Sequence, residues 1–170
     1  LLEWRGFLAG MTTSVKCLNA FFSGVTPRTA GFNSVDYAEA HPITLMVTDI
    51  YMFIGGGSAG TAGGIKITTA TVLLAAMLAE FKGRDATTVG HRTVPKSVVR
   101  QAMTVAAAGL VAVTAGVATL RICDPQFTAD QVNFEVISAF ATTGLSTGIT
   151  ADLSAPSQLA LCLLMYLGRI

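Results

Sequence analysis

Apolar segments of different lengths alternate with polar or glycine-rich breaks along the chain, and they predict helices of two kinds. Residues 13–23 and 131–141 are short segments of about eleven residues, whereas a helix needs roughly 20 residues to cross a bilayer. Residues 98–122 are the best spanning candidate, because charged residues occur only near their ends, where long side chains can reach the interface. We expect a last apolar helix over residues 157–170.

One long apolar segment, residues 43–81, is interrupted in its middle by glycine. Six of the ten residues from Gly55 to Gly64 are glycines, and each glycine costs a helix about 1 kcal/mol relative to alanine. We therefore expect a helix that is broken at this stretch. Asp49 lies within the apolar segment, and three interpretations of it stay open: it pairs with Lys66, it pairs with Arg169, or it faces a water-filled vestibule.

The chain also repeats itself at the offset of 113 residues that separates Gly31 from Gly144. The loop Thr29-Ala30-Gly31-Phe32-Asn33 follows the first short segment, and Thr142-Thr143-Gly144-Leu145-Ser146 follows the second. The same offset relates residues 52–55 to residues 165–168, so the similarity continues into the next apolar segment. This register indicates a duplicated unit of short helix, Thr-x-Gly loop and helix.

The composition favours lipid as the solvent of this protein. The chain is 52% hydrophobic and 12% charged, whereas soluble domains average about 25% charged residues; a large buried α/β core is the alternative. A net charge of +1 gives no argument for nucleic acid.

Cys17, Cys123 and Cys162 have neither metal-ligand spacing nor an even count, so we expect them to be packing residues. His41 and His91 are expected in solvated loops.

The distribution of basic residues orients the segments. Residues 82–100 contain five of the eleven Lys and Arg residues, so the positive-inside rule places them on the cytoplasmic side. The helix over residues 98–122 then leads to an outer loop that contains Asp124 and Asp130. The Thr142 loop is expected to enter the membrane from outside, and the repeat places the Thr29 loop on the same side.

The two Thr-x-Gly loops have the chemistry of a cation site. Irregular backbone at membrane depth is tolerated only where protein buries it or water meets it. Gly31 and Gly144 allow carbonyl groups to point in directions that other residues resist, and rings of carbonyl oxygens can replace the hydration shell of a cation. A simple turn after a helix is the plainer interpretation, but the recurrence of the pattern favours an ion pathway.

Four stretches together resemble the Trk/Ktr/HKT potassium transporters, specifically the membrane subunit of the bacterial Trk/Ktr branch. The stretches are residues 22–33, 55–66, 138–150 and 167–170. That family has four helix–pore-loop–helix repeats around one pore. The resemblance implies an all-α membrane protein with re-entrant filter loops, of which this chain holds two of the four repeats.

The resemblance divides the chain into a third repeat, residues 1–96, and a fourth repeat, residues 97–170. The third repeat would comprise the end of its first helix within residues 1–12, pore helix 13–23, filter 29–33, broken second helix 43–81 and cytoplasmic loop 82–96. The fourth repeat would comprise first helix 98–122, pore helix 131–141, filter 142–146 and truncated second helix 157–170. We expect both chain ends to be cuts through a longer protein, and we expect no signal peptide.

The resemblance also implies the site residues. One quarter of a K⁺ selectivity filter would be Thr29, Ala30, Gly31 and Phe32, and another quarter would be Thr142, Thr143, Gly144 and Leu145. A gate loop below the filter would comprise Gly55, Gly56, Gly57, Ser58, Ala59, Gly60, Thr61, Ala62, Gly63 and Gly64. Lys66 would follow the gate loop and Arg169 would project into the pore, although Arg169 could also be an interfacial end residue.

The implied function is potassium uptake across the bacterial plasma (inner) membrane by a multi-pass protein. The implied partners are the remaining two repeats of the same protein, a second copy of the full-length subunit, and a cytoplasmic nucleotide-binding regulatory subunit, for which residues 82–100 are a plausible face. No covalent cofactor and no enzyme activity are expected, because the sequence has no nucleotide, metal or catalytic-triad motif.

Two other interpretations stay open. Two repeats supply only half of a four-part filter, so the chain could be a non-conducting fragment that carries no selective K⁺ flux alone. A soluble dinucleotide-binding enzyme could use Gly55-x-Gly57-x-x-Gly60, with Glu80 as the acid 20 residues later. The expected second strand is missing before Glu80, and a phosphate-binding P-loop fails because Ile65 separates Gly64 from Lys66.

Overall fold

The computed structural model describes residues 2–4, 6, 8–57, 62–83, 86–90 and 92–169. These residues are mostly helical. The α-helices are α1 (Thr13–Val25), α2 (Pro42–Phe53), α3 (Ile67–Phe81), α4 (Lys96–Cys123), α5 (Ala129–Phe140) and α6 (Ala155–Arg169). The 3-10 turns are η1 (Leu2–Trp4), η2 (Tyr37–Glu39) and η3 (Ile149–Asp152), and an antiparallel hairpin is formed by β1 (Thr88–Val89) and β2 (Arg92–Thr93).

Helix α4 is, among the described helices, the one that is long and apolar enough to cross a membrane. Its 28 residues correspond to roughly 42 Å at about 1.5 Å per residue, more than the ~30 Å of a hydrocarbon core. Its length therefore exceeds what one crossing requires. The apolar segment before it is divided, because α2 ends at Phe53 and α3 begins at Ile67, on either side of the glycine stretch.

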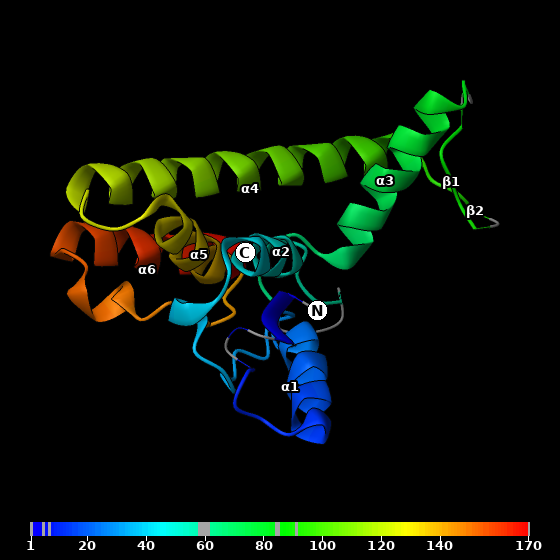
Figure 1. Ribbon diagram of the computed structural model, residues 1–170. Coiled ribbons are helices and arrows are strands. Elements are labelled where there is room, and N and C mark those ends of the chain that lie inside the picture. The colour runs from blue at the N-terminus through cyan, green and yellow to red at the C-terminus, as the bar shows by residue number, and fades with distance from the viewer. Residues whose placement is uncertain are drawn as a thin grey trace.

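Helices α4, α5 and α6 pack together, and α2 packs on α5 (Figure 1). Gly116 of α4 permits the close approach, because an added Cβ would lie 2.5 Å from Leu164 and 3.0 Å from Val136. The core between these helices contains Val113, Leu120, Val132, Val136, Phe140, Leu161 and Leu164. A second core joins η2, α2, α5 and the second Thr-x-Gly loop (residues 142–146; the first loop is residues 29–33). It contains Tyr37, Leu45, Met52, Phe134 and Leu145.

The two short helices differ sharply in burial. Helix α5 buries seven of its 12 residues, whereas α1 buries only Lys16 of its 13 residues. Figure 1 shows why: α5 lies between α4 and α2, while α1 extends away from them on the opposite side of the molecule from α4. The repeated units therefore share their elements but not their packing within this chain.

The N-terminal residues correct one expectation. Leu2–Trp4 forms a single 3-10 turn and residues 8–10 form turns, not the end of an α-helix, because the nearby Gly6 and Gly10 disfavour helix. Glu3 fastens this turn to the start of α2, since its Oε1 accepts hydrogen bonds from the His41 amide at 2.8 Å and the Thr44 hydroxyl at 2.5 Å.

The cysteines correct another expectation. Cys17, Cys123 and Cys162 are all exposed, so they are not packing residues of the cores in this chain. They lie on helical faces that turn away from the two cores, where an apolar side chain is compatible with lipid. His41 is exposed and its Nδ1 accepts a hydrogen bond from the Ile43 amide at 3.2 Å; His91 lies outside the described residues.

Asp124 connects the end of α4 to the start of α6. Its buried carboxylate accepts hydrogen bonds from the Ser154 amide at 3.2 Å and the Ser154 hydroxyl at 2.8 Å. Hydrogen bonding from Ser157 and Ser154 lowers the pKa of Asp124 below its ordinary value. Because the folded pKa is depressed, the ionised carboxylate stabilises the fold above the unfolded pKa of about 3.9, and this stabilisation is lost as pH falls through the folded pKa.

We predict that Asp124→Asn lowers the thermal unfolding midpoint of the full-length protein in detergent by several degrees at pH 7. The difference from the wild-type protein should shrink as pH falls below about 4. Asp152→Asn, at an exposed position of η3, is the matched control and should have little effect. A loss for Asp124→Asn that is equally large at pH 7 and pH 3 would contradict the role of the ionised carboxylate.

Candidate functional site

The two Thr-x-Gly loops share an unusual backbone conformation. Thr29 and Thr142 have φ values of 64° and 52°, and Gly31 and Gly144 have φ values of 71° and 87°. Thr29 and Thr142 are the two non-glycine residues with positive φ in the described part of the chain, and this conformation costs an L-residue roughly 1–2 kcal/mol. Residues that are 113 positions apart in the two loops thus share a strained backbone conformation as well as a similar sequence.

The flanking elements follow the same order around each loop. A short helix precedes the loop (α1 or α5), a 3-10 turn follows it (η2 or η3), and a longer helix comes next (α2 or α6). Helix α2 begins at Pro42 and α6 begins at Ala155, the positions that the offset relates. The similarity of the two units is therefore present in the fold.

The two loops meet through their backbones. A Cβ atom on Gly31 would collide with the carbonyl oxygen of Thr143 and would lie 3.8 Å from the Cα of Gly144. The Thr143 hydroxyl also donates a hydrogen bond to the Pro27 carbonyl at 3.5 Å. Loops that are more than 100 residues apart in sequence thus lie side by side.

The carbonyl groups of the loops are largely without hydrogen bonds. The Phe32 carbonyl is an exception, because it accepts a hydrogen bond from the buried Thr26 hydroxyl at 2.7 Å. Among the described residues, no hydrogen bond is accepted by the carbonyl oxygens of Thr29, Ala30, Gly31, Thr142, Thr143, Gly144 and Leu145. Backbone oxygens without partners are unusual where protein excludes water, so these oxygens are available to a ligand.

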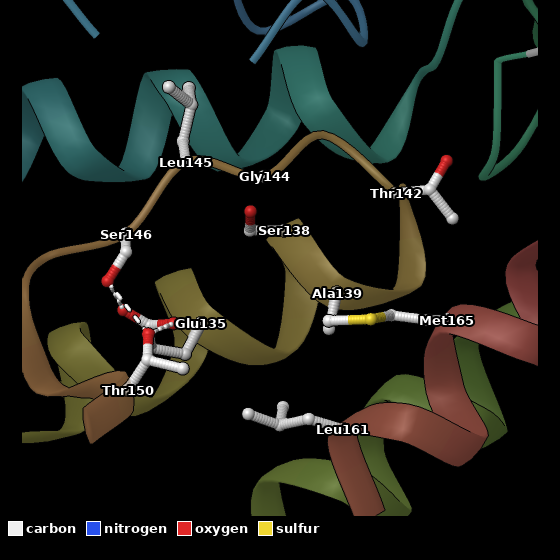
Figure 2. Close-up of a pocket in the computed structure, with 10 residues that line it drawn as sticks. All are labelled: Glu135, Ser138, Ala139, Thr142, Gly144, Leu145, Ser146, Thr150, Leu161 and Met165. Atoms are coloured by element: carbon white, nitrogen blue, oxygen red, sulfur yellow. Dashed lines mark hydrogen bonds between the residues drawn. The ribbon is translucent and has the colours of Figure 1, made fainter. Parts of the chain in front are cut away.

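The fourth residue of each predicted filter segment differs between the loops. Phe32 is 72% exposed, whereas Leu145 is 2% exposed and belongs to the second core. Figure 2 shows the Leu145 side chain directed toward α2, away from the cavity behind the loop. The second loop is therefore fixed by packing in this chain and the first loop is not.

The described ends of the glycine stretch touch both loops. Gly56 lies beside the first loop, since an added Cβ would be 3.8 Å from the Thr29 hydroxyl oxygen. Gly63 lies beside the second loop, where an added Cβ would be 2.5 Å from the Thr142 hydroxyl oxygen. Ser58, Ala59, Gly60 and Thr61 of the predicted gate loop lie outside the described residues.

Backbone hydrogen bonds close the glycine stretch at its base. The Gly55 amide donates to the Ile65 carbonyl at 2.9 Å, and the Ile65 amide donates to the Phe53 carbonyl at 3.2 Å. Helix α2, not a strand, precedes Gly55. This context does not match the strand, turn and helix of a dinucleotide-binding motif.

The predicted charged residues lie near the glycine stretch. Gly64, Lys66, Gly168 and Arg169 line one cavity of about 330 Å³, and the Gly64 amide donates to the Gly168 carbonyl at 3.1 Å. The Lys66 ammonium group donates to the Ala62 carbonyl. The Lys66 ammonium group therefore bonds to a nearby backbone carbonyl, and among the described residues it is not seen to pair with Asp49.

Asp49 lies in the middle of α2 and is partly buried. One of its carboxylate oxygens is buried without a hydrogen-bond partner in the described part of the chain. A buried carboxylate oxygen of this kind is costly unless water or another protein group reaches it.

The sequence-based prediction missed Glu135, a buried carboxylate behind the second loop. The available signal was one acidic residue inside a mostly apolar stretch, VNFEVISAF. Glu135 lies among the residues that line a cavity of about 300 Å³ together with Gly144 and Ser146 (Figure 2).

Comparisons with known proteins agree on one family. Residues 8–170 match the family model of TrkH, described as a cation transport protein. The chain is 38% identical to the Ktr system potassium uptake protein B of Bacillus subtilis over all of this chain and 38% of that protein. It is 38% identical to the potassium/sodium uptake protein NtpJ of Enterococcus hirae, over 94% of this chain and 36% of that protein.

A third relative is the Ktr system potassium uptake protein B of Vibrio alginolyticus, 35% identical over 96% of this chain and 36% of that protein. The chain thus spans less than two fifths of the length of these curated relatives. All three names describe transport proteins, not enzymes.

The contact between the loops predicts unequal effects of two alanine substitutions on stability. Gly31→Ala and Gly144→Ala should each lower the free energy of unfolding by about 1–2 kcal/mol because of positive φ. Gly31→Ala should cost clearly more, because its Cβ also collides with backbone, whereas a Cβ on Gly144 meets nothing within 4 Å.

Unfolding of the full-length protein in detergent measures both changes. Gly57→Ala is the control, since Gly57 has neither positive φ nor a neighbour within 4 Å of an added Cβ. Equal losses for Gly31→Ala and Gly144→Ala would show that the two loops do not meet as described.

Proposed function

Because the chain belongs to the TrkH family of cation transport proteins, we propose that it supplies half of the ion pathway of a potassium uptake transporter. The relatives are named for uptake of potassium, or of potassium and sodium. In this proposal residues 1–96 and 97–170 are two of four helix–pore-loop–helix repeats. The loops re-enter the membrane from outside and K⁺ is the transported ion.

The observation that carries this proposal is the meeting of two similar loops whose carbonyl oxygens, apart from that of Phe32, accept no hydrogen bond seen among the described residues. Thr29 to Phe32 and Thr142 to Leu145 would form two quarters of a selectivity filter. Carbonyl oxygens that no hydrogen bond satisfies are costly in an apolar medium, and a desolvated cation provides the missing partner. The Phe32 carbonyl, which Thr26 already engages, is the weakest candidate ligand of the eight residues.

The other two quarters would come from the remaining repeats of the same protein. The chain covers 36% to 38% of the three relatives, and α1 leaves most of its residues exposed and buries only Lys16. Further helices of a longer protein would cover α1 and complete the ring. Half a filter is insufficient for selective flux, so the 170-residue chain alone would be non-conducting.

The glycine stretch, residues 55–64, would form a gate below the filter. Its described ends touch Thr29 and Thr142, the first residues of both proposed filter segments. Lys66 and Arg169 line a common cavity at this level, where their positive charge would repel cations. Glycines lower the steric cost of rearranging such a stretch.

The proposed location is the bacterial inner membrane, which the full-length protein would cross several times. The basic residues 82–100 would face the cytoplasm, and the hairpin β1–β2 lies beside α3 within this region. We propose this region as the contact for a nucleotide-binding regulatory subunit, and we propose that the full-length protein is a homodimer.

A substitution at Gly144 tests the filter. Gly144→Ser in the full-length transporter should lower the ratio of K⁺ to Na⁺ uptake about tenfold, or about 1.4 kcal/mol, because serine resists the positive φ that orients the carbonyl groups. Gly90→Ser is the matched control, since Gly90 also has positive φ and open space but lies in the hairpin turn. An unchanged ratio for Gly144→Ser would argue strongly against the filter assignment.

A deletion tests the gate. Removing residues 56–63 should raise K⁺ flux severalfold, because the obstruction below the filter is lost. Uptake by whole cells, normalised to membrane-inserted protein, measures the change, with Gly10→Ala as the control, because Gly10 lies outside the proposed filter and gate and an added Cβ there meets nothing within 4 Å. Unchanged or lower flux in a well-folded deletion variant would reject the gate.

A further inference from the structure

A buried carboxylate, Glu135, lies behind the second loop and has no part in the proposed filter or gate. Its side chain is 4% exposed, and its neighbours on α5, Phe134 and Val136, are both 0% exposed. Burying a carboxylate is costly unless hydrogen bonds replace its hydration. The partners of Glu135 therefore indicate its role.

All of these partners come from the segment that follows Leu145. Glu135 Oε1 accepts hydrogen bonds from the Ser146 hydroxyl at 2.5 Å and from the Thr147 amide and hydroxyl at 3.0 and 3.4 Å. Glu135 Oε2 accepts a hydrogen bond from the Thr150 hydroxyl at 2.9 Å (Figure 2). Hydrogen bonds to an ionised group are roughly twice as strong as neutral ones, so one carboxylate fastens residues 146–150.

This segment has room to move if the carboxylate no longer holds it. The cavity of about 300 Å³ is lined by Gly144 and Ser146 on the loop side and by Leu161 and Met165 on the α6 side. Figure 2 shows Ser146 and Thr150 directed toward Glu135, while Leu145 points to the opposite side. The cavity therefore gives the segment after Leu145 room to shift toward α6.

The first loop has no equivalent of this anchor. The repeat offset places Phe22 at the position of Glu135, and the first loop is closed instead by the neutral hydrogen bond from Thr26 to Phe32. The two loops are thus held by different interactions, and among the described residues the charged anchor is found at the second loop.

We propose that Glu135 is a positioning residue that holds the carbonyl groups of Gly144 and Leu145 in place and thereby sets the preference for K⁺ over Na⁺. The proposal rests on the filter function proposed above. The hydration shells of the two cations differ in size, so displaced carbonyl oxygens stabilise them differently.

The test measures K⁺ and Na⁺ uptake by the full-length transporter at matched protein levels. Glu135→Gln keeps the shape of the side chain and removes its charge, and Thr150→Val removes one donor at an exposed position. We expect the K⁺/Na⁺ uptake ratio to fall about tenfold for Glu135→Gln and about threefold for Thr150→Val. The double variant should lose less than the two single effects combined, because both changes alter one hydrogen-bond network, in which the Thr150 hydroxyl contacts Glu135 and Ser146.

Thr114→Val is the matched control, since the exposed Thr114 hydroxyl bonds only to the Leu110 carbonyl of its own helix at 2.8 Å; it should leave the ratio unchanged. An unchanged ratio in Glu135→Gln and Thr150→Val, with only less folded protein, overturns the proposal. Gly144→Ser in the same assay separates the failures. If Gly144→Ser changes the K⁺/Na⁺ uptake ratio and Glu135→Gln does not, only the role of Glu135 is rejected. If neither variant changes the ratio, the filter assignment fails as well.

Discussion

The contact between Gly31 and the Thr143 carbonyl is the constraint on which the rest of the arrangement depends. Two irregular backbone segments can lie this close only where no side chain separates them. The same condition recurs below, where Gly63 lies against Thr142 and where Gly168 lies so close to Phe140 that a Cβ would collide with its carbonyl group. Glycine at three backbone crossings thus brings both loops, the glycine stretch and the end of α6 into one compact site.

Much of the helical framework could be predicted from local signals in the sequence. Glycine density indicates the interruption between α2 and α3, Pro42 indicates the start of α2, and charges near both ends indicate the extent of α4. The duplicated unit could also be predicted, because a constant offset requires no knowledge of contacts. These features depend on residues that are near in sequence, so their physical cause is visible in the sequence.

The rest depends on contacts that hydropathy does not encode. An apolar face that meets protein and one that meets lipid have the same composition, so neither the exposure of Cys17, Cys123 and Cys162 nor the different burial of α1 and α5 could be predicted. Glu135 was missed for a similar reason, since its partners lie 11 to 15 residues away in a loop of irregular path. Positive φ at Thr29 and Thr142 arises from this tertiary setting, because threonine has no intrinsic preference for it.

The hydrogen-bonded base of the glycine stretch makes the shape of the stretch independent of the spacing between α2 and α3. An ordinary linker transmits any change in its shape to the helices that it joins. Here the hydrogen bonds among Phe53, Gly55 and Ile65 hold the end of α2 beside the start of α3, so the spacing of these two helices does not depend on the residues between them. The length of the stretch can change while the spacing of the two helices stays constant. Variation in its length or sequence can therefore accumulate without altering the scaffold that carries the loops.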